Sequence, residues 1–334
     1  MPVERKKERP CHYHELFVQC DGLMRPCCRM ESVARVIGHV NDPDLSGKIN
    51  SFDAQCECES FILRRGLSAD RKSYFFLNVE TALSCNSKCA MCCVNAPSWR
   101  GKYDLYESLT KVIDTYRPMA MLLQGGEVLI QQKTLDWCVH IRKLFPDLEI
   151  NIATNGNAGI DMAAFLDGIA DRIIISIYGF QPETYKKVTG LNLDRTVSFA
   201  EELVKRGKSR VNLKYLTTPI NFHEAALFLH WALQLLPERI ILADSNIAQY
   251  INTDTPDNFW DKIIQRTSVS IQEELLSAIS ILKESGCSIV IDTNNRKYFG
   301  ISEDFLLSDD CLNSHITTPV KSRATLFSRG TGLM

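Results

Sequence analysis

Short apolar runs alternate with longer amphipathic segments through most of the chain after residue 73. Apolar, β-branched runs predict strands at 75–81, 120–124, 149–154, 172–178, 211–217 and 239–243. Segments of helical period predict helices at about 104–116, 131–145, 158–169, 193–206 and 222–236. Apolar strands that alternate with helices indicate a parallel sheet covered by helices. We therefore predict an α/β fold, a partial (βα)6 barrel with its site at the carboxyl ends of the strands.

A further pattern follows these units. A helical stretch at about 257–285 precedes a short strand at 288–292 and a polar tail. We predict three regions: a small cysteine-rich domain at 1–70, the barrel at 71–250, and a helix, strand and tail at 251–334 that cover the barrel.

Composition and charge narrow the class of protein. A chain of 334 residues with 45% hydrophobic content can bury a large core. The net charge of −2 and the lack of a basic stripe with interleaved aromatics argue against a nucleic-acid partner. The longest apolar stretch, 225–236, is too short to span a bilayer, and the charged N-terminus lacks the apolar run of a signal peptide. We expect a cytoplasmic protein that has no membrane partner.

Thirteen cysteines are an unusual number for such a protein. The reducing cytosol disfavours disulfides, and clustered cytosolic cysteines are typical of metal or redox sites. Six lie between Cys11 and Cys58, and four lie between Cys85 and Cys93. Two metal sites, one per cluster, are therefore expected.

The second cluster has a distinctive spacing. Cys85, Cys89 and Cys92 follow C-x3-C-x2-C in the loop after the first strand of the predicted barrel. Three thiolates are too few for a closed structural zinc site, and the adjacent Cys93 is poorly placed to be a fourth ligand. On a four-iron cluster, three cysteines leave one iron open to a ligand from outside the protein. The loop predicts an iron–sulfur cluster, with zinc as the alternative.

This motif, at this place in a βα barrel, resembles that of the radical S-adenosylmethionine (radical SAM) superfamily. The resemblance implies that S-adenosylmethionine (AdoMet) binds the open iron of a [4Fe-4S] cluster through its amino and carboxylate groups. It also implies that one electron from the cluster cleaves AdoMet to methionine and a 5′-deoxyadenosyl radical, which abstracts hydrogen from a substrate. An electron donor such as flavodoxin or ferredoxin is then a partner.

A second motif agrees with this resemblance. QGGEVL follows the second predicted strand, and its Gly125, Gly126 and Glu127 match the family's GGE motif, which holds the methionyl amino group of AdoMet. Glycines permit close backbone approach, and a carboxylate pairs with an ammonium. An ordinary strand-to-helix turn is the alternative.

Polar residues at later strands extend the resemblance. The sequence TNG (154–156) ends the third strand, and Ser176 lies in the fourth. The resemblance implies that Ser176 and Asn212 contact the ribose of AdoMet, with Lys214 as an alternative to Asn212. Met91 stands where the family usually has an aromatic residue before the third cysteine, and its thioether is expected to lie against adenine.

The first 60 residues contain another cysteine pattern. Ten residues separate Cys11 from Gly22, four separate Gly22 from Cys27, and a closing pair stands at Cys56 and Cys58. This arrangement resembles the SPASM or twitch extension of radical SAM enzymes, which binds an auxiliary four-iron cluster. The resemblance implies these four cysteines as its ligands, and Gly22 would let a hairpin bring Cys11 toward Cys27.

Two departures leave alternatives open. The extension usually follows the barrel, and its closing pair is usually C-x2-C rather than C-x-C. Cys20 and Cys28 are therefore rival ligands. A zinc knuckle that uses the same cysteines with His12, His14 or His39 is the other reading of the segment.

Three cysteines lie outside the clusters. Cys138 and Cys287 are expected to be buried and inert. Cys311 follows Asp309 and Asp310, whose carboxylates favour a neutral thiol. Radical SAM epimerases are similar in using a cysteine as hydrogen-atom donor, so Cys311 is a candidate catalytic residue, and an incidental surface cysteine is the alternative.

Together these features predict a radical SAM oxidoreductase or epimerase. The chain has no spare segment that is large enough for a separate peptide-recognition domain, which favours a small molecule or carbohydrate as substrate. A radical SAM enzyme that crosslinks or epimerises a peptide is one alternative. A non-catalytic zinc-binding interaction protein is an alternative from another class.

Overall fold

The structure is a computed structural model that describes residues 15–25, 36–51, 76–92, 96, 101, 103–218, 220–244, 269–284 and 288–291. Its strands are β1 (Glu15–Val18), β2 (Leu23–Arg25), β3 (Gly38–His39), β4 (Phe76–Glu80), β5 (Ala120–Gln124), β6 (Glu149–Thr154), β7 (Arg172–Ile177), β8 (Arg210–Thr217), β9 (Arg239–Asp244) and β10 (Ser288–Ile291). They form one sheet in the order β10-β9-β8-β7-β6-β5-β4-β1-β2-β3. Neighbouring strands are parallel from β10 to β1, whereas β2 and β3 are antiparallel additions.

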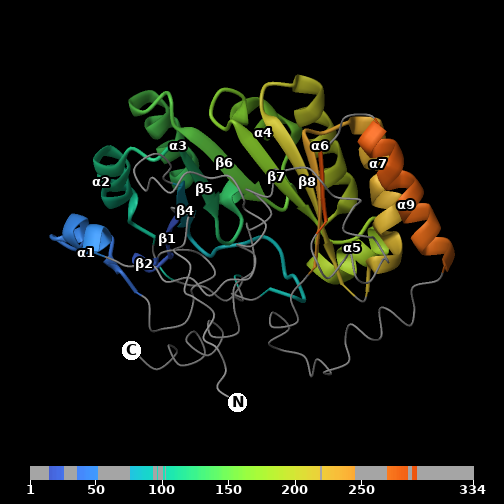
Figure 1. Ribbon diagram of the computed structural model, residues 1–334, viewed down its shortest axis with the longest axis horizontal. Coiled ribbons are helices and arrows are strands. Elements are labelled where there is room, and N and C mark those ends of the chain that lie inside the picture. The colour runs from blue at the N-terminus through green and yellow to red at the C-terminus, as the bar shows by residue number, and fades with distance from the viewer. Residues whose placement is uncertain are drawn as a thin grey trace, which may run out of the picture.

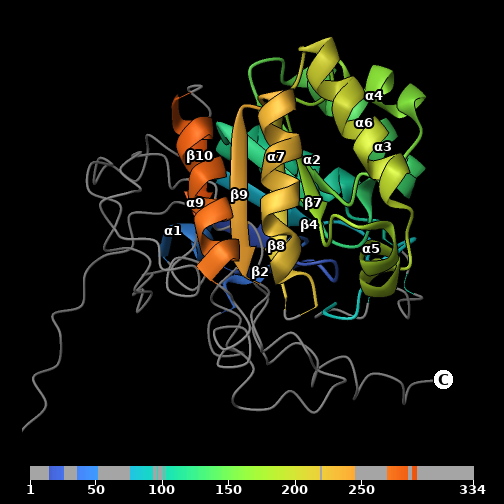
Figure 2. The ribbon, with the colours of Figure 1, turned by 90° about the vertical axis from the view of Figure 1, so that its right-hand side faces the viewer.

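Helices connect the parallel strands. They are α1 (Leu45–Ser51), α2 (Tyr106–Tyr116), α3 (Gln132–Leu144), α4 (Ile160–Leu166), α5 (Pro182–Thr189), α6 (Leu193–Arg206), α7 (Ala225–Leu235) and α9 (Val269–Glu284), with short 3-10 turns η3 (Val128–Ile130) and η4 (Phe222–Glu224). Figure 1 shows α1 and α9 at opposite ends of the sheet, and Figure 2 shows α7 beside α9. Among the described helices none has the length and apolar character to cross a membrane.

The predicted parallel α/β sheet is confirmed, and all six barrel strands lie within a residue or two of their expected bounds. The short strand near the C-terminus differs from expectation. It pairs in parallel with β9 as β10, so it extends the sheet and does not cover the barrel. The described part of the helix predicted at 257–285 is α9, which packs on α7.

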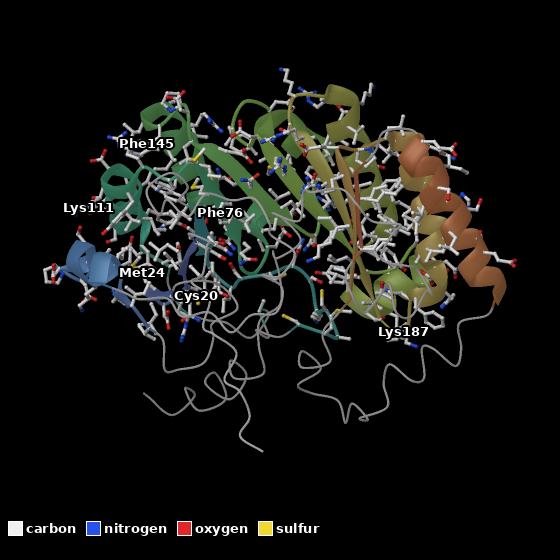
Figure 3. The ribbon with its side chains drawn as sticks, viewed as in Figure 1. Cys20, Met24, Phe76, Lys111, Phe145 and Lys187 are labelled. Atoms are coloured by element: carbon white, nitrogen blue, oxygen red, sulfur yellow. The ribbon has the colours of Figure 1, made fainter. Side chains whose placement is uncertain are left out.

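The described strands of the predicted cysteine-rich domain also belong to this sheet. β1 pairs in parallel with β4, and β1 and β2 form an antiparallel hairpin that closes at Gly22 with a φ of 85°. A Cβ atom on Gly22 would lie 2.4 Å from the ring of His39, which explains the need for glycine at this turn. The predicted sharp hairpin is present, and Cys20 and Met24 lie on it (Figure 3).

Alternating side chains divide the sheet into two faces. In β7, Ile173, Ile175 and Ile177 face the helices and belong to the main apolar core. The inner face carries polar residues as well as apolar ones. Asn78 donates a hydrogen bond to Glu15 on β1 (Nδ2–Oε1, 2.7 Å) and accepts one from Gln124 on β5 (Oδ1–Nε2, 2.9 Å). The inner face is thus a buried polar surface, as expected where a barrel takes a polar ligand.

Candidate functional site

The three cysteines of the C-x3-C-x2-C motif lie in the loop that leaves β4, and each sulfur has a hydrogen-bond partner. The backbone N–H of Ser87 donates to Cys85 Sγ at 3.4 Å, and the backbone N–H of Ala96 donates to Cys92 Sγ at 3.4 Å. The Ser87 hydroxyl lies 2.9 Å from Cys89 Sγ. Donors near the sulfurs suit thiolates that bind iron, because hydrogen bonds stabilise their negative charge.

Without a metal, Cys85 and Cys89 are held as thiols. Burial is the main cause that raises the pKa of Cys85 to about 11 and that of Cys89 to about 12, and the charges of neighbouring cysteines act in the same direction. Within the described residues, no group of three or more Cys, His, Asp or Glu side chains is arranged to hold a single metal ion. This arrangement does not favour zinc. A four-iron cluster binds each cysteine at a different iron, so its ligands need not converge on one point.

The glycine pair of the GGE motif brings the turn after β5 against the cysteine loop. A Cβ atom on Gly126 would lie 2.1 Å from the carbonyl oxygen of Ser84, so only glycine fits there. Gly125 has a φ of 137°, in the region that favours glycine. Backbone hydrogen bonds join Gly126 N–H to Ala82 O (3.2 Å) and Glu127 N–H to Ser84 O (2.9 Å). The turn therefore fixes the path of the chain into Cys85.

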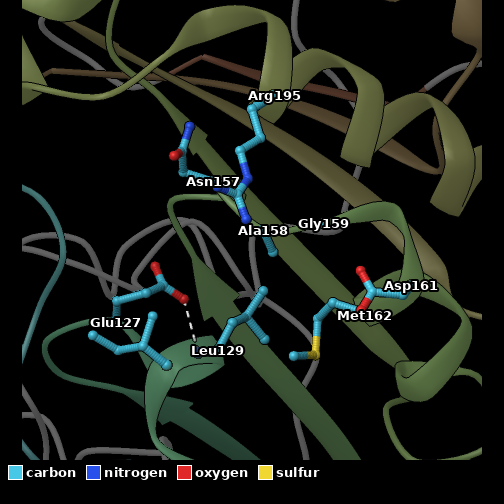
Figure 4. A pocket seen from close by; sticks show the side chains of 9 residues that line it. Glu127, Leu129, Asn157, Ala158, Gly159, Asp161, Met162 and Arg195 are labelled. Atoms are coloured by element: carbon cyan, nitrogen blue, oxygen red, sulfur yellow. Dashed lines mark hydrogen bonds between the residues drawn. The ribbon is translucent and has the colours of Figure 1, made fainter.

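The Glu127 carboxylate joins the turns after β5 and β6. It is 2% exposed. Its Oε1 accepts from the Leu129 N–H (2.9 Å, Figure 4) and the Thr154 hydroxyl (2.7 Å), and its Oε2 accepts from the Asn155 N–H (2.7 Å). Burial raises its pKa, while the three hydrogen bonds act in the opposite direction. A carboxylate has about four acceptor positions, so one position on Oε2 remains for an ammonium group.

The TNG segment completes the link between these turns. The Asn155 side chain donates from Nδ2 to Oδ1 of Asn86 at 2.8 Å, and Asn86 lies between the first two cysteines of the motif. Gly156 has a φ of 68°, and a Cβ atom there would lie 2.8 Å from Ile175. The motif after β6 therefore positions the cysteine loop, a role that the sequence alone did not assign to it.

Helix α5 was not predicted, yet it supports the cysteine loop. Two backbone N–H groups of the loop donate to its last residues, Lys88 to Thr189 O (2.8 Å) and Ala90 to Val188 O (2.9 Å). The Ser87 hydroxyl also donates to Thr189 O at 2.8 Å. A helix of eight residues has too few turns for a clear amphipathic period. Proline at its first position and Gly190 after its last are the signals that would have found it.

A buried carboxylate anchors the other end of α5. Glu224 is fully buried, and its Oε2 accepts from the backbone N–H groups of Phe180 (2.6 Å) and Gln181 (3.1 Å), which precede the helix. Negative charge at this end of a helix is favourable because the first N–H groups point toward it.

We expect Glu224→Gln to lower the free energy of unfolding by about 1–2 kcal/mol, because the amide oxygen can still accept both hydrogen bonds but no longer carries the charge that strengthens them. Urea denaturation measures the change. Glu183→Gln is the matched control, since Glu183 lies exposed in the first turn of the same helix. A similar loss in both variants would mean that the charge acts without the hydrogen bonds.

The inner face brings some predicted AdoMet contacts together and separates others. Ser176 lies opposite Lys214, and Asn212 lies two residue pairs away, opposite Ile174. Burial raises the pKa of the nearby Tyr178 well above its ordinary value, while the Ser176 side chain acts in the opposite direction. Both polar side-chain atoms of Asn212 are buried and have no hydrogen-bond partner among the described residues. Buried polar atoms without a partner are uncommon in folded proteins. Their presence here is what we expect where a ligand supplies the missing hydrogen bonds.

Several other predictions concern cysteines. Met91, beside the third cysteine of the motif, is buried. Cys138 in α3 is buried as expected, and burial raises its pKa to about 12. Cys20 is buried on the β1–β2 hairpin, and its backbone N–H donates to Glu80 Oε2 at 3.0 Å. The remaining predicted ligands and catalytic thiol lie outside the described residues: Cys11, Cys27, Cys28, Cys56, Cys58 and Cys311.

The candidate zinc ligand His39 has both ring nitrogens engaged. Its Nδ1 accepts from the Asn41 N–H at 3.1 Å, so its Nε2 carries the proton and donates to Asp21 O at 2.9 Å. This pairing leaves the ring no lone pair for a metal and argues against His39 in a zinc knuckle. His12 and His14 lie outside the described residues.

A pocket of about 230 Å³ lies beside Glu127 (Figure 4). Its lining combines apolar and polar residues from η3, the turn after β6, α4 and the start of α6: Leu129, Ile130, Asn157, Ala158, Gly159, Asp161, Met162 and Arg195. The pocket reaches the carboxylate that joins the turns after β5 and β6.

Comparison with known proteins agrees with this geometry. Residues 79–232 match the Radical SAM superfamily. A probable GTP 3′,8-cyclase of Thermoplasma volcanium is 24% identical over 212 residues, which cover 60% of this chain and 65% of the relative. The match thus spans less than two thirds of that protein.

Solved structures share the fold. The Streptococcus suis protein SuiB bound to precursor peptide SuiA has a TM-score of 0.54 and 13% identity, over 71% of this chain and 53% of SuiB. The structure of anSMEcpe with bound AdoMet has a TM-score of 0.51 and 16% identity, over 65% of this chain and 63% of anSMEcpe. The likeness shows that this chain shares the fold of these two structures, an α/β fold with a mostly parallel sheet.

Proposed function

We propose that this chain is a radical SAM enzyme in which Cys85, Cys89 and Cys92 hold a [4Fe-4S] cluster and AdoMet binds the open iron. The observation that carries the proposal is the cysteine loop itself, which follows β4 in the region that matches the Radical SAM superfamily and gives each sulfur a hydrogen-bond partner. The loop is fixed by the GGE turn and α5. When bound, the cluster supplies the electron that cleaves AdoMet and so generates the radical that abstracts hydrogen from the substrate.

The residues around this loop have proposed roles toward AdoMet. Glu127 has one acceptor position left on Oε2, which suits the methionyl ammonium. Gly125 and Gly126 hold the backbone close to the cysteine loop. Ser176 and Asn212 are proposed to contact the ribose, and the buried amide of Asn212 supports a polar ligand on the inner face. Met91 is proposed to lie against adenine.

We propose oxidation or epimerisation of a small molecule or carbohydrate as the reaction. The buried polar inner face supports a polar substrate, and the curated relative is named for a nucleotide cyclase. Peptide modification is the second candidate, and it is favoured by the fold shared with SuiB, whose structure holds a precursor peptide. The proposal includes a one-electron donor such as flavodoxin or ferredoxin.

Two further parts of the proposal concern cysteines outside the described residues. An auxiliary [4Fe-4S] cluster is proposed at Cys11, Cys27, Cys56 and Cys58, with Cys20 or Cys28 as rivals. Cys311 is proposed as the donor of a hydrogen atom to the substrate radical. Both rest on the sequence patterns.

The test of the main proposal is anaerobic purification and reconstitution with iron and sulfide, followed by incubation with AdoMet and dithionite. We expect a brown protein that forms methionine and 5′-deoxyadenosine. A colourless protein that contains zinc and forms no 5′-deoxyadenosine would overturn the proposal and support the zinc-binding alternative.

A further inference from the structure

We propose that the hydroxyl of Ser87 donates a hydrogen bond to the sulfur of Cys89 when iron is bound, and that this bond raises the reduction potential of the cluster. The inference rests on the proposed function, because it requires a cluster at the three cysteines. Ser87 lies between Cys85 and Cys89 and is 3% exposed, so water does not compete for its hydroxyl.

The Ser87 hydroxyl has two neighbours but only one proton. Its Oγ lies 2.9 Å from Cys89 Sγ and 2.8 Å from the carbonyl oxygen of Thr189. Without iron, the Cys89 thiol can donate its own proton to Ser87 Oγ, while Ser87 donates to Thr189 O. Both hydrogen bonds can then form at once, in a series that runs from the thiol through the hydroxyl to the carbonyl.

Iron binding removes one donor from this series of hydrogen bonds. A cysteine that binds iron is a thiolate, so Cys89 can only accept a hydrogen bond. The Ser87 proton then has a choice between a neutral carbonyl and an anionic sulfur, and charge-assisted hydrogen bonds are the stronger ones. Thr189 O still accepts from the Lys88 N–H at 2.8 Å. Turning the Ser87 proton toward sulfur therefore leaves no buried carbonyl without a donor.

The expected consequence is electronic. Hydrogen bonds to the sulfurs are among the factors that set the potential of an iron–sulfur cluster. A donor stabilises the more negative, reduced cluster and so raises its potential. Cys85 and Cys92 have backbone donors, which no side-chain substitution removes. Among the described residues, Ser87 is the side chain that hydrogen-bonds to a sulfur of the motif from a buried position.

The experiment is a redox titration of the reconstituted full chain without AdoMet, followed by electron paramagnetic resonance. For Ser87→Ala we expect the ratio of reduced to oxidised cluster at the wild-type midpoint to fall several-fold. A tenfold fall would correspond to about 59 mV for a one-electron couple. Ser87→Thr keeps the hydroxyl and should stay near the wild type. Ser84→Ala is the control, because the bond that Ser84 makes to Glu127 uses its backbone carbonyl and is kept in this variant.

The outcomes separate this inference from the proposed function. A Ser87→Ala cluster with the wild-type potential overturns the inference and leaves the proposed function intact. A wild-type chain that binds no four-iron cluster overturns the proposed function first, and iron analysis detects this directly.

A second measurement applies if Ser87→Ala assembles no cluster. Electron–nuclear double resonance of the reduced wild-type cluster in deuterated buffer should show one exchangeable deuteron that couples more strongly than those of the two backbone amides, whose nitrogens lie 3.4 Å from their sulfurs. The absence of that deuteron overturns the inference.

Discussion

Replacing Cys85, Cys89 and Cys92 together with alanine should remove about four irons per chain and abolish AdoMet cleavage, because a cluster cannot be held without its thiolates. The three side chains are partly exposed, so their loss leaves the apolar core unchanged and the variant should fold. Iron and sulfide analysis of the reconstituted variant beside the wild type measures the effect. Cys138→Ala removes a buried thiol from α3 and should keep the wild-type iron content.

The iron that remains in the triple variant tests the proposed auxiliary cluster. If Cys11, Cys27, Cys56 and Cys58 hold a second cluster, the wild type should contain about eight irons and the triple variant about four. A variant that is colourless and contains one zinc ion would support the zinc knuckle. Unchanged iron in the triple variant would show that the C-x3-C-x2-C loop is not the site.

The features that could be predicted from the sequence are those that depend on residues close together in the chain. Strands such as β7, with its run of isoleucines, and helices such as α6, with a long amphipathic period, follow directly from hydrophobic spacing. The C-x3-C-x2-C and GGE motifs were also recognisable, because each depends on residues close together in the chain. The place of both motifs after consecutive strands put them at one end of a parallel sheet.

Features that depend on distant contacts could not be predicted. The pairing of β1 with β4 joins residues about 60 positions apart, and a strand of four residues carries no strong pattern of its own. The same holds for the support of the cysteine loop by α5, which links Ser87 to Thr189. The register between β7 and β8 determines which β7 residues lie beside Asn212 on the inner face, and a sequence does not reveal this register.

Glu127 was recognised from its motif, but its hydrogen bonds to neighbouring turns were not predicted. The sequence indicated a partner for an ammonium group, whereas the structure shows three hydrogen bonds that already tie the carboxylate to the turns after β5 and β6. The two roles are compatible, because the carboxylate has about one acceptor position more than the protein uses. They also make different predictions for variants.

Glu127→Gln should weaken both the fold of the site and AdoMet binding. The new amide group places N–H atoms opposite a protein donor, whichever way it is turned, because Leu129, Thr154 and Asn155 donate to both oxygens. A donor left without an acceptor costs about 1–3 kcal/mol of unfolding free energy. Loss of the charge should also lower AdoMet affinity at least about tenfold, which corresponds to 1.4 kcal/mol. Urea denaturation and equilibrium binding of AdoMet to the reconstituted chain measure the two effects.

Thr154→Val separates these effects, because it removes one hydrogen bond to Glu127 and keeps the charge. This variant should lose about 2–4 kcal/mol of unfolding free energy, because the Thr154 hydroxyl donates to a charged group and also accepts from the Gly156 N–H. It should keep AdoMet affinity within a few-fold of the wild type. The contrast between the two variants is the critical result. If Thr154→Val and Glu127→Gln weaken AdoMet binding equally, the carboxylate acts by holding the turns together, and the methionyl ammonium must be bound by another group.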